Sequence, residues 1–359
     1  MVNSVRVGLV GTSWWADSFH LPMLKSHPQA EIAAICGRNR ERAEEMAKKY
    51  DIPGVFTDYR EMIENSNLGA IVISTPDDSH YPITMNALDA GLHVMCEKPI
   101  ALNAGHAKEM YEKAEAAGVK HMVLFTWRWL PHYQYLKTLI DTGYLGRAFQ
   151  CQLRFLGGYG RDDQYGWRFD RTRANGILGD LGSHMVDFAR WYVGDIARVS
   201  AHLATFVDRS GSEGQALDPA NDSAVVTLEF VNGAQGTIQV SAVDHLGGSG
   251  YEHHVTLYGE LGTLDAEYTF PGIALYGVRH DEKEFIALPV PDSFWGHVDK
   301  SDPWNVFDNQ SVGDRLFIDA IVEDRSVSPN FYDGWKVQQV IDAAIESHRS
   351  GSWVSLPQS

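Results

Sequence analysis

The fold is decided by one stretch, Val94-Met95-Cys96-Glu97-Lys98-Pro99, in which a short apolar run ends in two charges and a proline. An apolar run of this length predicts a buried strand, and the proline ends it. Ligands of open parallel sheets bind outside the carboxyl ends of the strands. Lys98 is therefore expected at a ligand-binding edge, although an ordinary surface turn is the other interpretation of this tripeptide.

On both sides of this strand, apolar runs alternate with amphipathic stretches, which is the pattern of βαβ units. Besides residues 93–96, strands are expected at Val5–Val10, Glu31–Cys36, Ala70–Ser74 and His121–Phe125. Helices are expected at Arg40–Tyr50, at Tyr81–Ala90 and from the cap Asn103 to Gly118. We therefore predict an α/β Rossmann domain, with a doubly wound parallel sheet that binds NAD(P), over residues 1–126.

The pattern changes in residues 127–359, where longer alternating strands follow a linking helix at Pro131–Ile140. These strands are expected at Phe149–Phe155, Val199–Val207, Ala224–Phe230, Ala234–Val243, His253–Tyr258 and Gly272–Val278. Val231-Asn232-Gly233 is typical of a hairpin, and two helices at 315–323 and 335–349 are expected to return toward the first domain. This pattern predicts an α+β substrate-binding and oligomerisation domain with a large, mostly antiparallel open sheet. Its uncovered face favours a homodimer or homotetramer.

Composition excludes several kinds of partner. The formal net charge of −17 argues against nucleic acid and anionic membrane surfaces. Three cysteines far apart, Cys36, Cys96 and Cys151, give neither a disulfide framework nor the spacing of a metal site. The chain begins without a charged and then apolar leader, and no apolar run is long enough for a membrane span. We therefore expect a cytoplasmic protein without a metal.

A glycine turn follows the first expected strand, at Gly11-Thr12-Ser13-Trp14-Trp15-Ala16. Backbone amides and a helix N-terminus at such a turn bind the pyrophosphate of a dinucleotide. Ser13 occupies the position of the second glycine of the usual motif, so only Gly11 and Ala16 match it. The position of the turn in the βαβ series supports a cofactor site.

About twenty-five residues past Gly11, where NAD-binding folds usually carry a carboxylate, the sequence has Arg38. An arginine there suits a 2′-phosphate and favours NADP over NAD, while stacking of Arg38 on adenine is the alternative. Ser74, Thr75 and Pro76 end another strand at the same edge and are further cofactor candidates. His80 follows them, either as a cofactor contact or as a capping or packing residue.

A second constellation is Asp180 and His184, which are four residues apart on a helix that continues to Tyr192 and therefore share one face. Such a pair can exchange a proton near neutral pH, or it can be a capping Asp beside a surface His. Nearby aromatic and charged residues, Tyr165, Trp167 and Arg168, suit polyol binding or the packing of a lid. Trp127 and Arg128 form either a wall for substrate or nicotinamide or an interdomain contact.

Together these residues resemble the Gfo/Idh/MocA family of sugar and polyol oxidoreductases, over essentially the whole chain. The most specific matches are Ala90–Pro99 and Asp180–His184, supported by Thr75-Pro76 with His80. The resemblance implies hydride transfer between NAD(P) and a secondary alcohol or ketone of a sugar, inositol or related polyol. It also implies that Lys98, Asp180 and His184 are catalytic and contact substrate. Glu97 would face the nicotinamide ribose or its neighbours.

Two other activities remain open within this resemblance. One is a redox-neutral glycosidase that holds NAD tightly, oxidises its sugar transiently, eliminates and re-reduces it. The other is a regulator that senses the dinucleotide without chemistry. The intact set Lys98, Asp180 and His184 argues against the regulator, because a sensor does not need a proton-transfer pair.

Overall fold

The structure is a computed structural model that describes residues 4–211, 214, 216–269 and 272–357. The chain divides into two compact units. The first runs up to Trp129 and includes the later segment Trp295–Lys336, here called the return segment. The second comprises Leu130–Phe294 and the chain from Val337 onward.

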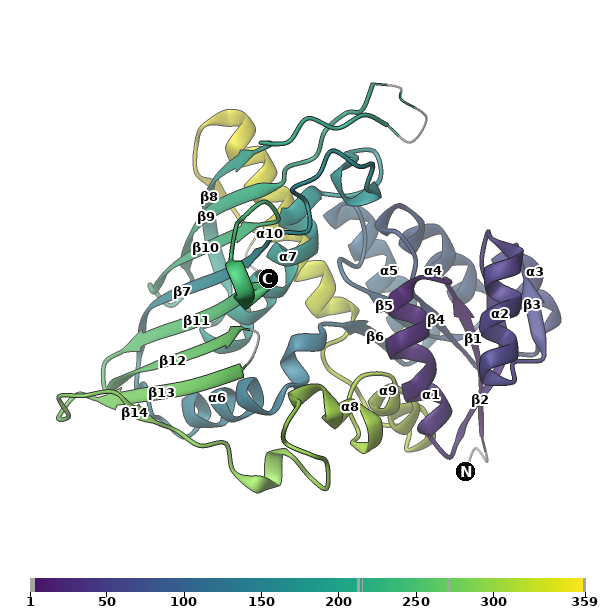
Figure 1. Cartoon of the computed structure of the whole chain (residues 1–359), viewed down its shortest axis with the longest axis horizontal. Coiled ribbons are helices and arrows are strands. Elements are labelled where there is room, and N and C mark those ends of the chain that lie inside the picture. Colours follow the sequence, from purple (N-terminus) through teal and green to yellow (C-terminus); the bar gives the residue numbers. More distant parts are fainter. Residues whose placement is uncertain (1–3, 212–213, 215, 270–271, 358–359) are drawn as a thin grey trace. The chain divides into compact units, whose positions relative to one another are not determined.

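The first unit is built on a parallel sheet, which among the described residues has six strands in the order β3-β2-β1-β4-β5-β6. The strands are β1 Val5–Val10, β2 Ala30–Cys36, β3 Gly54–Phe56, β4 Ala70–Ile73, β5 His93–Glu97 and β6 His121–Leu124. Because the order reverses between β1 and β4, their carboxyl ends form the switch point at which doubly wound sheets bind ligands. Figure 1 shows this sheet among its helices.

Helices of the first unit connect these strands and are placed by local signals. They are α1 Leu21–Ser26, α2 Arg40–Tyr50, α3 Tyr59–Asn65, α4 His80–Asp89 and α5 Ala104–Ala117. Asn103 caps α5 by accepting a hydrogen bond from the backbone N–H of His106, and Gly118 ends it with φ +66°. The return segment adds α8 Val306–Asn309 and α9 Gly313–Val322.

The second unit contains a larger sheet, with the strand order β14-β13-β12-β11-β7-β10-β9-β8-β15 over the described residues. Its strands are β7 Ala148–Gly157, β8 Ile196–Ala204, β9 Ser223–Phe230, β10 Gln235–Ser241, β11 Tyr251–Gly259, β12 Gly262–Thr269, β13 Gly272–Arg279, β14 Ile286–Ala287 and β15 Val354–Ser355. All neighbours are antiparallel except β7 and β10, which are parallel. The predicted hairpin joins β9 and β10, with Gly233 at φ +84°.

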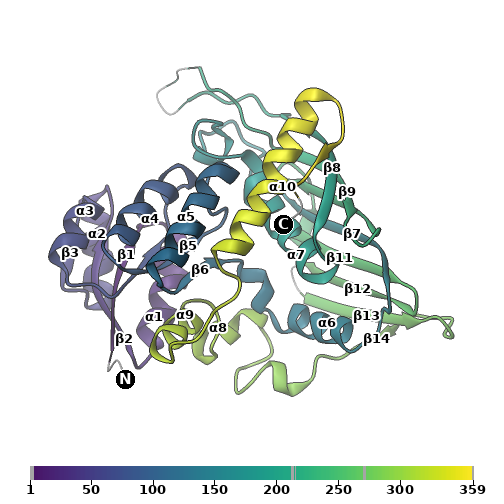
Figure 2. The same ribbon diagram turned by 180° about the vertical axis from the view of Figure 1, so that it is seen from behind.

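One face of this sheet packs on helices. Helix α7, Gly176–Tyr192, lies against β7, β9 and β10, and α6, Pro131–Asp141, lies against β12 and β13; Figure 2 shows both from behind. Buried residues alternate with exposed ones along β9 and β10, which is expected where only one face is covered. The C-terminal helix α10, Phe331–Ser350, begins in the return segment and continues in the second unit.

The predicted fold class is confirmed, and most elements lie within two residues of their expected bounds. Four of the described strands were missed, namely β3, β12 and the two-residue strands β14 and β15. β3 has only three residues, and β12 carries Asp265 and Glu267 on its less buried face. Within the described residues, no helix combines the length and apolar character needed to cross a bilayer.

Candidate active site

The glycine turn after β1 approaches the end of β4 very closely. Gly11 has φ +125°, and a Cβ there would lie 2.0 Å from the carbonyl oxygen of Ser74. Only glycine fits this position, since a side chain would clash in a conformation that L residues rarely adopt. The Ser13 hydroxyl, in place of the second motif glycine, accepts a hydrogen bond from the backbone N–H of Ala16 at 3.1 Å. The turn therefore retains the tight geometry that a dinucleotide requires.

The two tryptophans of this turn have different environments. Trp14 is 73% exposed. The indole N–H of Trp15 donates a hydrogen bond to Glu97 Oε1 at 2.6 Å, which links the turn to the end of β5. Thr12 packs against Gly37, where a Cβ would lie 2.4 Å from Thr12 Cγ2. Thus the turn is held against the ends of β5 and β2.

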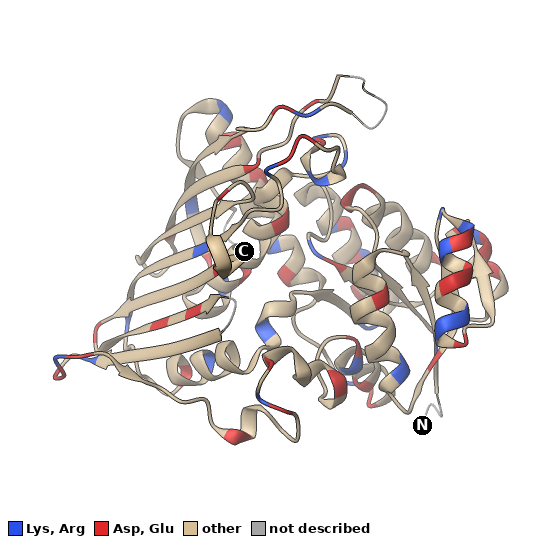
Figure 3. Cartoon of the chain, in the orientation of Figure 1, with Lys and Arg blue, Asp and Glu red and all other residues tan. Residues whose placement is uncertain are grey.

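Arg38 lies exposed just after β2. The next residue, Asn39, caps α2 through the backbone N–H of Arg42 at 3.0 Å. The Arg42 guanidinium itself binds Asp17 at 2.7 Å and Glu45 at 3.3 Å. Acidic and basic residues are interspersed along α2 (Figure 3). Arg38 is therefore better placed than Arg42 to meet an anionic cofactor group.

His80 joins the turns that follow β4 and β5. Its side chain is fully buried. Nδ1 lies 2.8 Å from the carbonyl oxygen of Pro99, and Nε2 lies 2.9 Å from that of Thr75. Burial lowers the pKa of His80, and the two carbonyls partly oppose this effect. These contacts correspond to the packing role among the two alternatives, and they position the segment Ser74-Thr75-Pro76 beside the end of β5.

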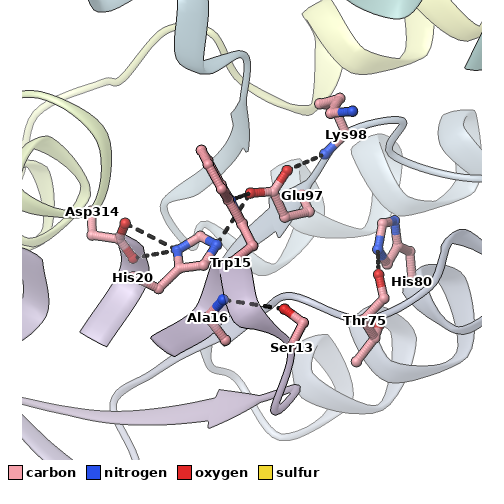
Figure 4. A network of polar contacts seen from close by, with 9 residues as sticks. All are labelled: Ser13, Trp15, Ala16, His20, Thr75, His80, Glu97, Lys98 and Asp314. Carbon is pink, nitrogen blue, oxygen red and sulfur yellow. Dashed lines mark hydrogen bonds and ion pairs between the residues drawn. The ribbon is translucent and has the colours of Figure 1, made fainter. Parts of the chain in front are cut away.

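A buried ionic network holds the end of β5. His20, on the π-helical segment Ala16–His20, has Nδ1 at 3.0 Å from the Asp314 carboxylate and Nε2 at 3.1 Å from Glu97 Oε1. Glu97 Oε2 accepts a hydrogen bond from the backbone N–H of Lys98 at 3.1 Å. Figure 4 shows this series of contacts, which runs from Asp314 through His20 to Glu97 and Lys98. Lys98 is half-buried and follows directly.

Charge explains the protonation of this network. Although burial favours neutral groups, the carboxylates of Asp314 and Glu97 raise the pKa of His20 to about 10. Burial also opposes ionisation of Glu97, but the hydrogen bond and charge of His20 hold its pKa below the usual value. The network is therefore an imidazolium between two carboxylates.

Trp127 and Arg128 pack against the return segment. The Trp127 ring lies 5.3 Å from that of Trp304, measured between centroids. Arg128 Nη2 lies 3.8 Å from Asp333 Oδ1. Both residues are buried. Trp304 also meets Trp15 edge-on at 6.5 Å, so an aromatic cluster borders the Glu97 network.

In the second unit, Asp180 and His184 lie on the first turns of α7. Gly176 starts this helix at φ +66°, where a Cβ would lie 2.3 Å from the carbonyl oxygen of Asn221. Asp180 Oδ2 accepts a hydrogen bond from the Tyr159 hydroxyl at 2.6 Å and pairs with Arg168 Nε at 3.0 Å. His184 is 5% exposed. The carboxylate of Asp180 is thus fixed by two partners.

Aromatic and charged residues before α7 contact one another. The Arg168 guanidinium lies 4.4 Å above the Trp167 ring. The Tyr165 hydroxyl donates to Asp170 Oδ2 at 3.3 Å. Arg168 therefore contacts both the Trp167 ring and the Asp180 carboxylate.

The structure brings the predicted residues together in two sets. Those of the first unit, from Gly11 to Arg128, follow the carboxyl ends of β1, β2, β4, β5 and β6, and those of the second unit lie before and at the start of α7. Sequence reasoning missed His20, Asp314, Tyr159 and Trp304. Neither His20 nor Asp314 lies in a motif recognised from the sequence, and 294 residues separate them in the chain. The described residues contain no group of His, Cys, Asp and Glu that could hold a metal ion.

Comparisons with known proteins agree with this geometry. Residues 5–125 match a family model described as an oxidoreductase family with an NAD-binding Rossmann fold, and residues 133–265 match the GFO/IDH/MocA C-terminal domain. Levoglucosan dehydrogenase of Pseudarthrobacter phenanthrenivorans is 28% identical over 99% of both chains. D-glucoside 3-dehydrogenase of Escherichia coli is 30% identical over 64% of this chain and 68% of that protein. A solved levoglucosan dehydrogenase in complex with NADH and levoglucosan superimposes with a TM-score of 0.88 at 26% identity, covering 99% of this chain and 100% of that one.

Proposed function

Because this chain belongs to the Gfo/Idh/MocA family of oxidoreductases, we propose that Lys98, Asp180 and His184 act together on one carbinol of its substrate. The reaction class is hydride transfer between NAD(P) and the secondary alcohol or ketone of a sugar or polyol. Inositol and related polyols are included among the candidate substrates. The observation that carries the proposal is Lys98 at the carboxyl end of β5, anchored by the Glu97 network beside the glycine turn.

The residues present fit the cofactor. The close approach of Gly11 to Ser74 leaves no room for a side chain under the turn. We assign the contacts with the cofactor to residues 11–15, Ser74–Pro76 and the Glu97-Lys98 strand end. When bound, NAD(P) supplies or accepts the hydride. We assign its pyrophosphate to the glycine turn and its adenosine end to Arg38.

The chain's own side chains handle the proton and the developing charge. Lys98 donates a hydrogen bond to the substrate oxygen and stabilises its alkoxide character. His184 takes the hydroxyl proton during oxidation and returns it during reduction. Asp180 orients the imidazole and stabilises its charged form, and it is suited to this because Tyr159 and Arg168 hold its carboxylate.

We further propose a preference for NADP over NAD, since Arg38 follows β2 where NAD-binding folds usually carry a carboxylate. Replacing Arg38 with Ala should lower kcat/KM for NADP by roughly tenfold or more while changing kcat/KM for NAD little, because a charge-assisted contact to the 2′-phosphate is lost. Steady-state kinetics with each coenzyme measures both. Arg40→Ala is the matched control, since Arg40 is exposed at the start of α2 and Arg38 lies exposed just before it. If kcat/KM fell equally for NADP and NAD, Arg38 would not bind the 2′-phosphate.

A panel of sugars and polyols, assayed separately with NAD and NADP, tests the proposed reaction. At least one substrate should give a stoichiometric change in nicotinamide absorbance. A redox-neutral glycosidase would release a sugar product without net change in NAD(P)H. Binding of the coenzyme without turnover of any member would instead favour the regulator.

The open sheet face supports a homodimer or homotetramer. Exposed residues recur on adjacent strands of this face, including Gln150 and Gln152 on β7, Thr237 and Gln239 on β10, and Val225 on β9. Light scattering after gel filtration should give a mass of two or four chains, and a monomer would refute the assignment. All three cysteines are buried free thiols, which suits the reducing cytoplasm in which we place the protein.

A further inference from the structure

We propose that His20 is a positioning residue for Lys98, acting as an imidazolium that Asp314 holds against Glu97. The inference rests on the catalytic role of Lys98 proposed above. It assigns a function to two residues, His20 and Asp314, that belong to neither the nucleotide turn nor the Lys98 motif.

Geometry supports a dedicated network rather than a chance ion pair. His20 and Asp314 are fully buried, and Glu97 is 8% exposed. Both Asp314 oxygens lie 3.0 Å from His20 Nδ1, and Glu97 Oε1 lies 3.1 Å from Nε2. Because each ring nitrogen faces a carboxylate, both carry a proton.

Glu97 receives hydrogen bonds from three directions, which fixes the end of β5. Trp15 donates from the nucleotide turn, His20 from the segment that follows it, and the backbone N–H of Lys98 donates to the second oxygen. The Lys98 backbone is therefore held best by the ionised form of Glu97, since a protonated carboxyl is a weaker acceptor for that hydrogen bond than a carboxylate. A misplacement of about 1 Å in a group that contacts substrate can cost about 10²-fold in rate.

The charges around Glu97 make its ionisation depend on His20. The titratable groups that interact with Glu97 are His20, Lys98, the buried His80 and Cys96, with Asp314 on the far side of His20. Burial of Glu97 acts to raise its pKa, and the hydrogen bond and charge of His20 outweigh this effect together with those of Lys98 and Trp15. Without His20, Glu97 would lose one donor and the nearest buried positive charge, so its pKa would rise.

The test is a pair of variants, His20→Gln and the double variant His20→Gln/Asp314→Asn. In His20→Gln the amide can donate to only one of the two carboxylates, and the loss of the imidazolium charge raises the pKa of Glu97. We expect kcat to fall by about 10²-fold, with little change in the KM for coenzyme. We also expect a new acid limb, in which kcat decreases as pH falls, at a pH where the unchanged protein keeps its activity.

In the double variant, the asparagine amide introduced at position 314 can donate to the carbonyl of the glutamine introduced at position 20. The amide of that glutamine can in turn donate to Glu97, which leaves Glu97 ionised without a second buried charge. The double variant should therefore lose the acid limb and recover most of the kcat lost in the single variant. A purely structural role would lower stability in both variants and leave the pH profile parallel to that of the unchanged protein. A folded His20→Gln protein with normal kcat and pH profile would overturn the proposal.

A measurement on the unchanged protein keeps the proposal testable if His20→Gln does not fold. NMR of isotope-labelled histidine should show His20 protonated through neutral pH, and titration near its ordinary pKa would refute the network. Failure here is distinct from failure of the proposed function. If Lys98→Met abolishes turnover while His20→Gln is normal, only the positioning role is wrong.

Discussion

Replacing Lys98 with Met is expected to lower turnover by about 10²–10³-fold or more, while coenzyme affinity stays close to that of the unchanged protein. Met keeps most of the length of Lys but has no ammonium to stabilise charge on the substrate oxygen. Lys98 follows the anchored end of β5 and is half-buried, so loss of its charge is not compensated by bulk water. Turnover is measured by nicotinamide absorbance and coenzyme affinity by fluorescence titration.

Lys48→Met is the matched control for this variant. Lys48 is exposed on α2 in the same unit, and its loss should leave both turnover and coenzyme binding unchanged. If Lys98→Met turned over at nearly the normal rate, the assignment of Lys98 would be wrong. If both turnover and coenzyme affinity were lost, Lys98 would be a cofactor ligand rather than the group that stabilises the substrate oxygen.

His184→Asn is expected to lower kcat/KM for alcohol oxidation by about 10²–10⁴-fold, the usual contribution of a general base. The pH profile should change as well. Oxidation requires neutral His184, so kcat/KM of the unchanged protein should have an acid limb, in which it decreases as pH falls. In the variant that limb should disappear, because no imidazole remains to titrate.

His280→Asn is the control, since His280 is exposed after β13 in the same unit. It should keep the activity and the acid limb of the unchanged protein. A His184→Asn protein that retains this limb would assign the titration to another group and contradict the role of His184 as base.

Much of the fold could be predicted from local patterns in the sequence. The bounds of β1 and α2 agree with the sequence because continuous apolar runs and clear caps mark them. β12 alternates buried and less buried residues instead of forming a continuous apolar run, because Asp265 and Glu267 lie on its partly exposed face. Asp265 pairs there with His254 of β11 at 2.8 Å. The assignment of β12 as a strand depends on pairing with β11 and β13, which are tertiary contacts.

The residues of the candidate site also differ in whether a local sequence pattern marks them. Gly11, Lys98, Asp180 and His184 are found from motifs because each lies at a strand end or helix start with its own local signature. Asp314 has none, since its role depends on the return segment meeting a histidine 294 residues earlier in the chain. Tyr159 lies in a glycine-containing loop, and its link to Asp180 also arises only in three dimensions.

The central claim is that Lys98 and His184 act on the same oxygen of one substrate. A crystal structure of the protein with coenzyme and a sugar or polyol from the panel tests it most directly. The account predicts that Lys98 Nζ and the His184 imidazole both lie within hydrogen-bond distance, about 2.6–3.2 Å, of one carbinol oxygen. A structure of this complex that places the two side chains far apart would contradict the claim.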